Sequence, residues 1–253
     1  MRSGAPVVRE VVTAMTARAS EINVHGTFEW KDLRVEAEIL REIEAGKSLV
    51  SVWSPSTDDF EKVALRGKTG TTIRISSWFQ LLGVIIQTGS ISRLNVFTHG
   101  KRAFVGFQGD LVRGDVLMDP KTAMTVDNLQ ELHSLDHLDV KGKKNQRFRP
   151  DELLKEVHKR FEADAKIILY ACDSGADLEL LNTVRDTFQV TVIGFKLPIA
   201  YKVNVVGGRK HSVEIGYTFT QTKTDFHDLD LNDPEHVIRV PRKVPQPIPK
   251  PKP

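Results

Sequence analysis

The sequence predicts an α/β fold, with a mainly parallel sheet sandwiched by helices and a short antiparallel addition near the C-terminus. One observation and one rule of sheet architecture carry this prediction. Short apolar runs of strand length alternate with segments whose apolar residues recur at helical spacing. Strands that are joined through helices lie parallel in one sheet, with the helices on its faces. The 253 residues are enough for one large domain or two small ones.

The expected elements can be listed in chain order. Strands are expected at 48–53, 71–75, 93–98, 166–171 and 190–195. Helices are expected over about 76–87, 150–161 and 176–188, the first of them capped by Ser76 or Ser77. The glycine pair Gly207-Gly208 indicates a hairpin over 203–219, and segments 103–107 and 116–118 have the pattern of a short antiparallel addition. Loops are expected over 54–70 and 119–150.

Three regions follow from this pattern. Residues 1–46 are expected to form an N-terminal helical extension, because apolar residues near helical spacing end at Gly46. Residues 47–220 hold the alternating strands and helices of the α/β domain. Residues 221–253 form a polar tail whose last part, from Val240, is rich in proline and lysine. Such a composition has no apolar face for a core, so an extended tail is expected.

Composition excludes several classes of protein. The chain is 40% hydrophobic and 27% charged, as in ordinary globular domains, and its formal net charge of +3 makes a nucleic-acid partner an unfavoured interpretation. No apolar run is long enough to cross a membrane, and the first twenty residues lack a secretory core. A single cysteine cannot form an internal disulfide. We therefore expect a soluble, cytoplasmic protein with no membrane partner.

One pair of residues stands out against this background. Cys172, the single cysteine, ends the apolar strand 166–171, and His99 ends the apolar strand 93–98. Open α/β sheets build their sites at the carboxyl ends of strands. A single cysteine with a distant histidine is a recognised pattern for a catalytic nucleophile. The sequence therefore predicts that Cys172 and His99 meet at one edge of the sheet.

This pair has the chemistry of a thiol hydrolase. The nucleophile would be the Cys172 thiolate, and a position just before a helix N-terminus would lower its pKa. His99 would take the thiol proton and protonate the leaving amine. The backbone N–H of Gly100, unobstructed by a side chain, would stabilise the substrate oxyanion. No metal or organic cofactor is needed for these steps.

The same segments resemble those of the caspase-like cysteine peptidases, which include caspases, metacaspases, gingipains, separases and CHAT domains. The likeness covers residues 48–195. It consists of a strand ending in His99-Gly100 and a later strand ending in Ala171-Cys172, and the run Cys172-Asp173-Ser174-Gly175 is similar to the Cys-x-Ser-Gly of metacaspases. The resemblance implies an endopeptidase with Cys172 as nucleophile, His99 as general acid/base and Gly100 as oxyanion donor. Its partners would be proteins or peptides.

Residues around the nucleophile depart from the family patterns. Tyr170 stands where caspases carry Gln, and the acidic residue that metacaspases carry two positions before the cysteine is absent. Substrate preference therefore does not transfer. The alternative is a non-catalytic caspase-like module, in which Cys172 is a core residue, Asp173 or Ser174 caps the next helix, and the Pro-rich tail docks on a partner.

Two further segments were weighed for function. The basic segment 141–149 lies between His99 and Cys172 and is a hypothetical site of self-cleavage in a peptidase. His133 and His137 are four residues apart and would share one face of a helix, as metal ligands do, but they lie in a polar, loop-like segment. We expect no metal there.

Overall fold

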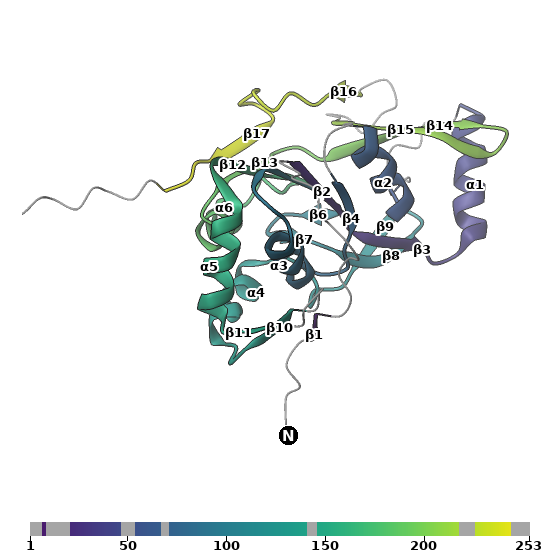
Figure 1. The fold of residues 1–253 in the computed structure, drawn as a ribbon. Helices are drawn as coiled ribbons and strands as arrows, with labels where there is room; N and C mark the ends of the chain where they lie inside the picture. Colours follow the sequence, from purple (N-terminus) through teal and green to yellow (C-terminus); the bar gives the residue numbers. More distant parts are fainter. Residues whose placement is uncertain are drawn as a thin grey trace, which may run out of the picture.

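The computed structural model describes residues 7–8, 21–46, 54–66, 71–140, 146–217 and 226–243. Its centre is a six-stranded sheet in the order β17-β13-β12-β5-β2-β4 (Figure 1). These strands are β17 (Val237–Val240), β13 (Thr191–Phe195), β12 (Phe161–Tyr170), β5 (Ile91–Phe97), β2 (Glu21–His25) and β4 (Thr71–Arg74). All neighbours are parallel except β13 and β17. The predicted α/β class with a mainly parallel sheet is confirmed.

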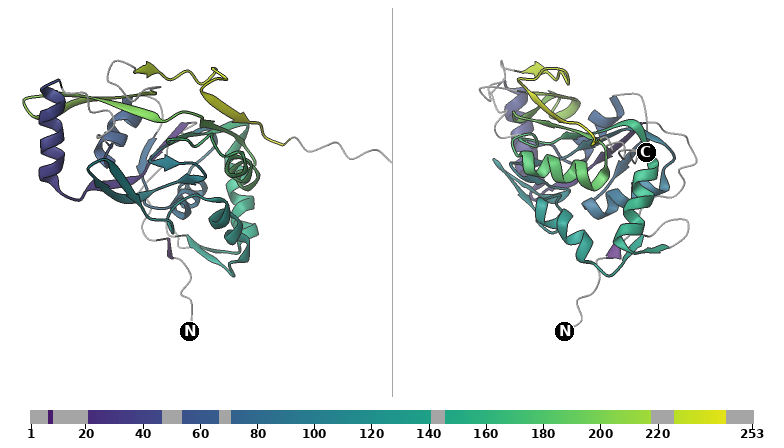
Figure 2. Two further views of the ribbon diagram at one scale, coloured as in Figure 1. Left: turned by 180° about the vertical axis from the view of Figure 1, so that it is seen from behind. Right: turned by 90° about the vertical axis from the view of Figure 1, so that its left-hand side faces the viewer.

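Apolar side chains cover both faces of this sheet. On one face they come from α3 (Trp78–Gln87), α5 (Pro150–Arg160) and α6 (Leu178–Phe188). On the other face they come from α1 (Leu33–Glu44), α2 (Thr57–Arg66) and a hairpin of β14 (Ile199–Val206) and β15 (Arg209–Tyr217). Figure 2 shows these layers from behind and from the side. Helices α3, α5 and α6 match three predicted helices, and Ser77 is the N-cap of α3.

The N-terminal region differs from its prediction. Helix α1 lies in the expected segment, but residues 21–30 are not helical: β2 enters the central sheet, and β3 (Thr27–Trp30) joins a second sheet. β2 is short and carries two buried polar residues, Asn23 and His25, so it lacks the apolar run that marks a buried strand. The described part of 1–46 is therefore integrated into the fold. The predicted strand 48–53 lies outside the described residues.

Two predicted loops contain regular structure. Segment 54–70 includes α2, whose Phe60, Val63 and Ala64 are buried at helical spacing. Segment 119–150 includes α4 (Val126–Glu131), the 3₁₀ turn η1 (Leu132–Ser134) and the strand pair β10 (Leu138–Val140) and β11 (Gln146–Phe148), with β1 (Val7–Val8) beside β10. The exposed residues of these short elements are polar, so the sequence shows no clear helical or strand spacing of apolar residues. Of the basic segment, residues 141–145 lie outside the described part.

The antiparallel additions are also rearranged relative to the prediction. The strand at 116–118 exists as β9 (Asp115–Met118), but it pairs with β8 (Gln108–Val112), while β6 (Gly100–Lys101) pairs with β7 (Phe104–Val105). The hairpin around Gly207-Gly208 is confirmed. It forms a separate three-stranded sheet with β16 (His227–Asp228), not an edge of the central sheet.

The C-terminal region is partly built into the core. Segment 221–253 was predicted to be a tail, yet β17 forms the antiparallel edge of the central sheet, with Val237 and Val240 buried. The tail segment 244–253 lies outside the described residues. Among the helices that are described, none combines the length and apolar character needed to cross a bilayer.

Candidate functional site

The strands that carry His99 and Cys172 are direct neighbours. β5 and β12 pair in parallel with Phe97 opposite Tyr170, and the Thr98 N–H donates to the Tyr170 carbonyl at 3.1 Å. The segments that follow β5 and β12 therefore leave the sheet at the same edge. The predicted meeting of the two strand ends is present in the structure.

The small residues at these strand ends have a packing reason. A Cβ atom on Gly100 would lie 2.8 Å from the Ala171 Cβ and 2.8 Å from the Cys172 carbonyl oxygen. Real Cβ atoms do not approach other atoms that closely, so glycine is required at position 100. The His-Gly and Ala-Cys pairs thus owe their Gly and Ala to the contact between the two strand ends.

His99 is buried and held by one hydrogen bond. Its side chain packs edge-on against Phe28 and Phe60, with ring centroids 4.6 and 5.1 Å away, and its Nε2 lies 2.8 Å from the Pro55 carbonyl oxygen. Burial lowers the pKa of His99 to about 4, although the hydrogen bond to Pro55 acts in the opposite direction. A carbonyl oxygen can only accept, so Nε2 carries the proton. The neutral ring therefore leaves Nδ1 unprotonated and able to act as a base.

Cys172 is protonated in this structure. Its Sγ donates to the Ile199 carbonyl at 3.4 Å, and burial raises the pKa of the thiol to about 11. The sequence predicted the reverse, a pKa lowered by a helix directly after the cysteine. That expectation is wrong for this structure, because α6 begins at Leu178 with Asp177 as its N-cap, and a turn separates the helix from Cys172. Neither Asp173 nor Ser174 caps the helix.

Cys172 and His99 are not hydrogen-bonded to each other. Each instead bonds to a backbone carbonyl from outside the two strands, Ile199 for the thiol and Pro55 for the imidazole. The Phe60 ring contacts the His99 ring and also the Tyr201 ring, 5.5 Å away, and Tyr201 is a residue of β14. Both reactive groups are therefore covered by α2 and β14 in this conformation.

The Ser-Gly of the cysteine motif has a structural role. The Ser174 hydroxyl donates to the Leu169 carbonyl at 2.9 Å and accepts from the Phe195 N–H at 3.1 Å. Gly175 approaches Gly194 so closely that a Cβ on either residue would lie 2.8 Å from backbone atoms of the opposing segment. Asp173 adopts a left-handed conformation with a φ of 52°, which completes the turn. These contacts fasten the turn after Cys172 onto β13.

Sequence reasoning missed the backbone groups of the site. Pro55, which orients His99, contributes only its carbonyl oxygen, and Ile199 does the same for Cys172. A main-chain carbonyl leaves no signature in a sequence, because every residue has one. Tyr201 lies two residues before the predicted hairpin 203–219, and nothing in the chain order links it to Cys172.

The two histidines weighed as metal ligands do not share a helix face. His133 lies in η1 and pairs with Asp151 at 3.7 Å, whereas His137 lies beyond η1 and contacts Arg147. A search of the described residues finds no group of three or more His, Cys, Asp or Glu side chains arranged to hold a metal ion.

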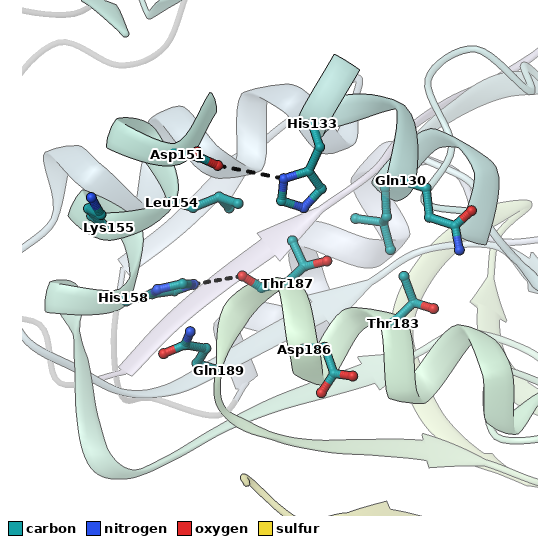
Figure 3. A pocket seen from close by; sticks show the side chains of 11 residues that line it. Gln130, His133, Asp151, Leu154, Lys155, His158, Thr183, Asp186, Thr187 and Gln189 are labelled. Atoms are coloured by element: carbon teal, nitrogen blue, oxygen red, sulfur yellow. Dashed lines mark hydrogen bonds and ion pairs between the residues drawn. The ribbon is translucent and has the colours of Figure 1, made fainter. Parts of the chain in front are cut away.

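One described groove lies away from the strand ends. It runs between α4, α5 and α6, encloses about 530 Å³, and is lined mainly by polar side chains (Figure 3). The His158 Nε2–H donates there to the Thr187 carbonyl at 2.8 Å, and Asp186 binds Lys243 at 2.7 Å. These groups are satisfied by the protein itself, and none is next to Cys172. We therefore assign the candidate site from the strand ends and not from the size of this groove.

Comparisons with known proteins add no assignment: no family model, no curated protein and no solved structure matches this chain.

Proposed function

We propose that this chain is a caspase-like cysteine endopeptidase in which Cys172 is the nucleophile and His99 the general acid/base. One observation carries the proposal. His99 follows the end of β5 and donates its Nε2–H to the Pro55 carbonyl, which leaves Nδ1 unprotonated, and Cys172 follows the end of the neighbouring parallel strand β12. A base that is oriented by a third group is the arrangement that activates nucleophiles in hydrolases.

The proposed reaction follows from these protonation states. The Cys172 sulfur attacks the scissile carbonyl carbon while the thiol proton passes to Nδ1 of His99. The imidazolium then protonates the leaving amine, the C–N bond breaks, and an acyl-thioester remains on the sulfur. His99 next takes a proton from water, whose oxygen attacks the thioester carbon. The C–S bond breaks, the carboxylic acid leaves, and the imidazolium returns its proton to the Cys172 sulfur. The Pro55 carbonyl would stabilise the imidazolium through its hydrogen bond throughout.

Gly100 is the proposed oxyanion donor. Its backbone packs against the Cys172 carbonyl so closely that no side chain fits between them. In the proposed reaction the N–H of residue 100 would donate to the oxyanion of a substrate bound at the sulfur. The substrate would be a protein or peptide, and the chain would work in the cytoplasm, where a free thiol stays reduced. Self-processing within 141–149 is part of the same proposal.

A second function is favoured by the closed state of the site. A thiol with a pKa of about 11 is almost fully protonated at neutral pH, and His99 is only 7% exposed. These features suit a non-catalytic caspase-like module that binds partners through its surface and through docking of the Pro-rich tail. The two functions differ in whether the thiol ever reacts with a peptide.

Peptide hydrolysis tests the proposed function. The full chain is incubated with a library of internally quenched peptides, and new termini are identified by mass spectrometry. We expect cleavage by the wild type and none by Cys172→Ala, because alanine offers no nucleophile. Ser134→Ala, an exposed hydroxyl that bonds only to the Glu131 carbonyl, is the matched control and should cleave like the wild type. Equal cleavage by the wild type and Cys172→Ala would contradict the proposal.

A further inference from the structure

The hairpin β14–β15 lies directly over the candidate nucleophile. Its first residue, Ile199, accepts the hydrogen bond of the Cys172 thiol, and Tyr201, two residues further on, packs against Phe60. Tyr201 is 8% exposed, and its hydroxyl has no hydrogen-bond partner among the described residues. The hairpin belongs to its own sheet, so no ladder of strand hydrogen bonds ties it to the central sheet. Other contacts must hold it in place.

A buried ion cluster supplies one such contact. Lys210 of β15 places its Nζ 3.1 Å from Asp59 of α2 and 3.0 Å from Glu36 of α1. The Asp59 side chain is completely buried, and the Lys210 side chain is only 14% exposed. Asp59 is also held by the N–H and hydroxyl of Ser56, at 2.9 and 3.1 Å. One lysine of the hairpin therefore neutralises a buried carboxylate of the helix beneath it.

This ion cluster adjoins the groups that cover the dyad. Ser56 directly follows Pro55, whose carbonyl holds His99, and Asp59 directly precedes Phe60, which packs between His99 and Tyr201. The hairpin turn is fastened at a second point, because the N–H groups of Gly207 and Gly208 donate to the Glu44 carboxylate at 2.6 and 2.8 Å. Both ties lie toward the turn of the hairpin, because Lys210 pairs with Val205 and is two residues from Gly208, so α1 and α2 together hold this end of the hairpin (Figure 1).

We propose that the β14–β15 hairpin is an inhibitory cover over the Cys172 thiol and that Lys210 is its lock. In the closed state the hairpin removes water from the sulfur and occupies its hydrogen bond through Ile199. When the Lys210 contacts break, Asp59 is left buried without its counter-charge, so the closed state loses its advantage. Access to the thiol is then governed by local opening of the hairpin. The claim that the cover regulates a peptidase rests on the proposed function. The claim that the hairpin controls access to the Cys172 thiol does not.

Alkylation of Cys172 measures this opening without any reference to hydrolysis. Because the chain has one cysteine, the mass gained from iodoacetamide reports that thiol alone. We expect Lys210→Met, which keeps the length of the side chain and removes its charge, to react about a hundredfold faster than the wild type at neutral pH. Lys202→Met is the control. It removes a lysine from the same hairpin, but one whose side chain is 51% exposed and 3.9 Å from Glu214, and it should react like the wild type.

Urea at concentrations below the unfolding transition distinguishes local opening of the hairpin from global unfolding. Local opening exposes little surface, so the alkylation rate of Lys210→Met should be nearly independent of urea, whereas global unfolding would make it rise steeply. If Lys210→Met does not fold, Glu44→Ala tests the same cover from its exposed turn and should react faster than the wild type, though less so. Rates equal to the wild type in both variants, or a steep urea dependence, would overturn the proposal. Faster alkylation without peptide cleavage in Lys210→Met would support the cover and contradict the peptidase.

Discussion

The variant His99→Gln should retain its fold and lose peptide hydrolysis by a factor of about 10²–10⁴ in kcat, because removal of a general acid/base costs that much. Glutamine keeps a side-chain amide that can donate to the Pro55 carbonyl, but it cannot take up the thiol proton. The effect should fall on kcat, with KM little changed, since His99 acts on the proton and not on substrate binding. Steady-state kinetics on a peptide from the cleavage library would measure it.

His158 provides a matched control for this substitution. Its Nε2 lies 2.8 Å from the Thr187 carbonyl, so it makes the same kind of hydrogen bond as His99, but in the helical layer of α5 and α6. His158→Gln should keep the wild-type kcat. A normal kcat in His99→Gln, or equal losses in the two variants, would contradict the role assigned to His99.

Acid should destabilise the protein through the same histidine. The pKa of His99 is about 4 in the folded state and 6.5 when it is free of the fold, because burial disfavours the imidazolium. Between these values the unfolded chain binds the proton and the folded chain does not, so stability falls as the pH drops from 6.5 toward 4. The full loss amounts to about 3 kcal/mol in the free energy of unfolding. It is absent above pH 7.

The contribution of His99 is isolated by comparing two pH dependences. Urea unfolding of the wild type and of His99→Gln would be followed by circular dichroism at several pH values between 7.5 and 4.5. Carboxylates and the other histidines titrate in both proteins, so the difference between the two curves belongs to position 99. We expect the variant to lose less stability than the wild type on acidification. Parallel curves would show that His99 is not buried as a neutral ring.

The elements around the site were predictable where their sequence is apolar. Strands β5 and β12 end in mainly apolar, buried segments, 94–97 and 167–169. Parallel strands place their carboxyl ends at one edge, so the neighbourhood of His99 and Cys172 followed from sequence alone. β2 and β17 were missed for the opposite reason. β2 buries Asn23 and His25, and β17 is a four-residue edge strand that follows a polar stretch.

The pKa of the Cys172 thiol and the orientation of the His99 ring could not be predicted from motifs. The spacing of Cys172 from a helix suggested a lowered thiol pKa, but the pKa depends on which segment covers the sulfur. That segment, β14, comes 27 residues later in the chain, and its contact is a backbone carbonyl. The orientation of His99 likewise depends on Pro55, which lies 44 residues earlier. Long-range backbone contacts of this kind have no local sequence signal.

The central claim is that Cys172 and His99 act together on a peptide. It is tested most directly by the mass of the covalent adduct formed with a mixed set of peptidyl acyloxymethyl ketones, which react with a thiol that has bound the peptide part. We expect one adduct on the wild type, none on Cys172→Ala, and a much slower reaction with His99→Gln. The claim would be contradicted if the wild type reacted with the peptidyl ketone no faster than with the same ketone lacking its peptide, and if His99→Gln reacted at the same rate. This result would favour the non-catalytic module.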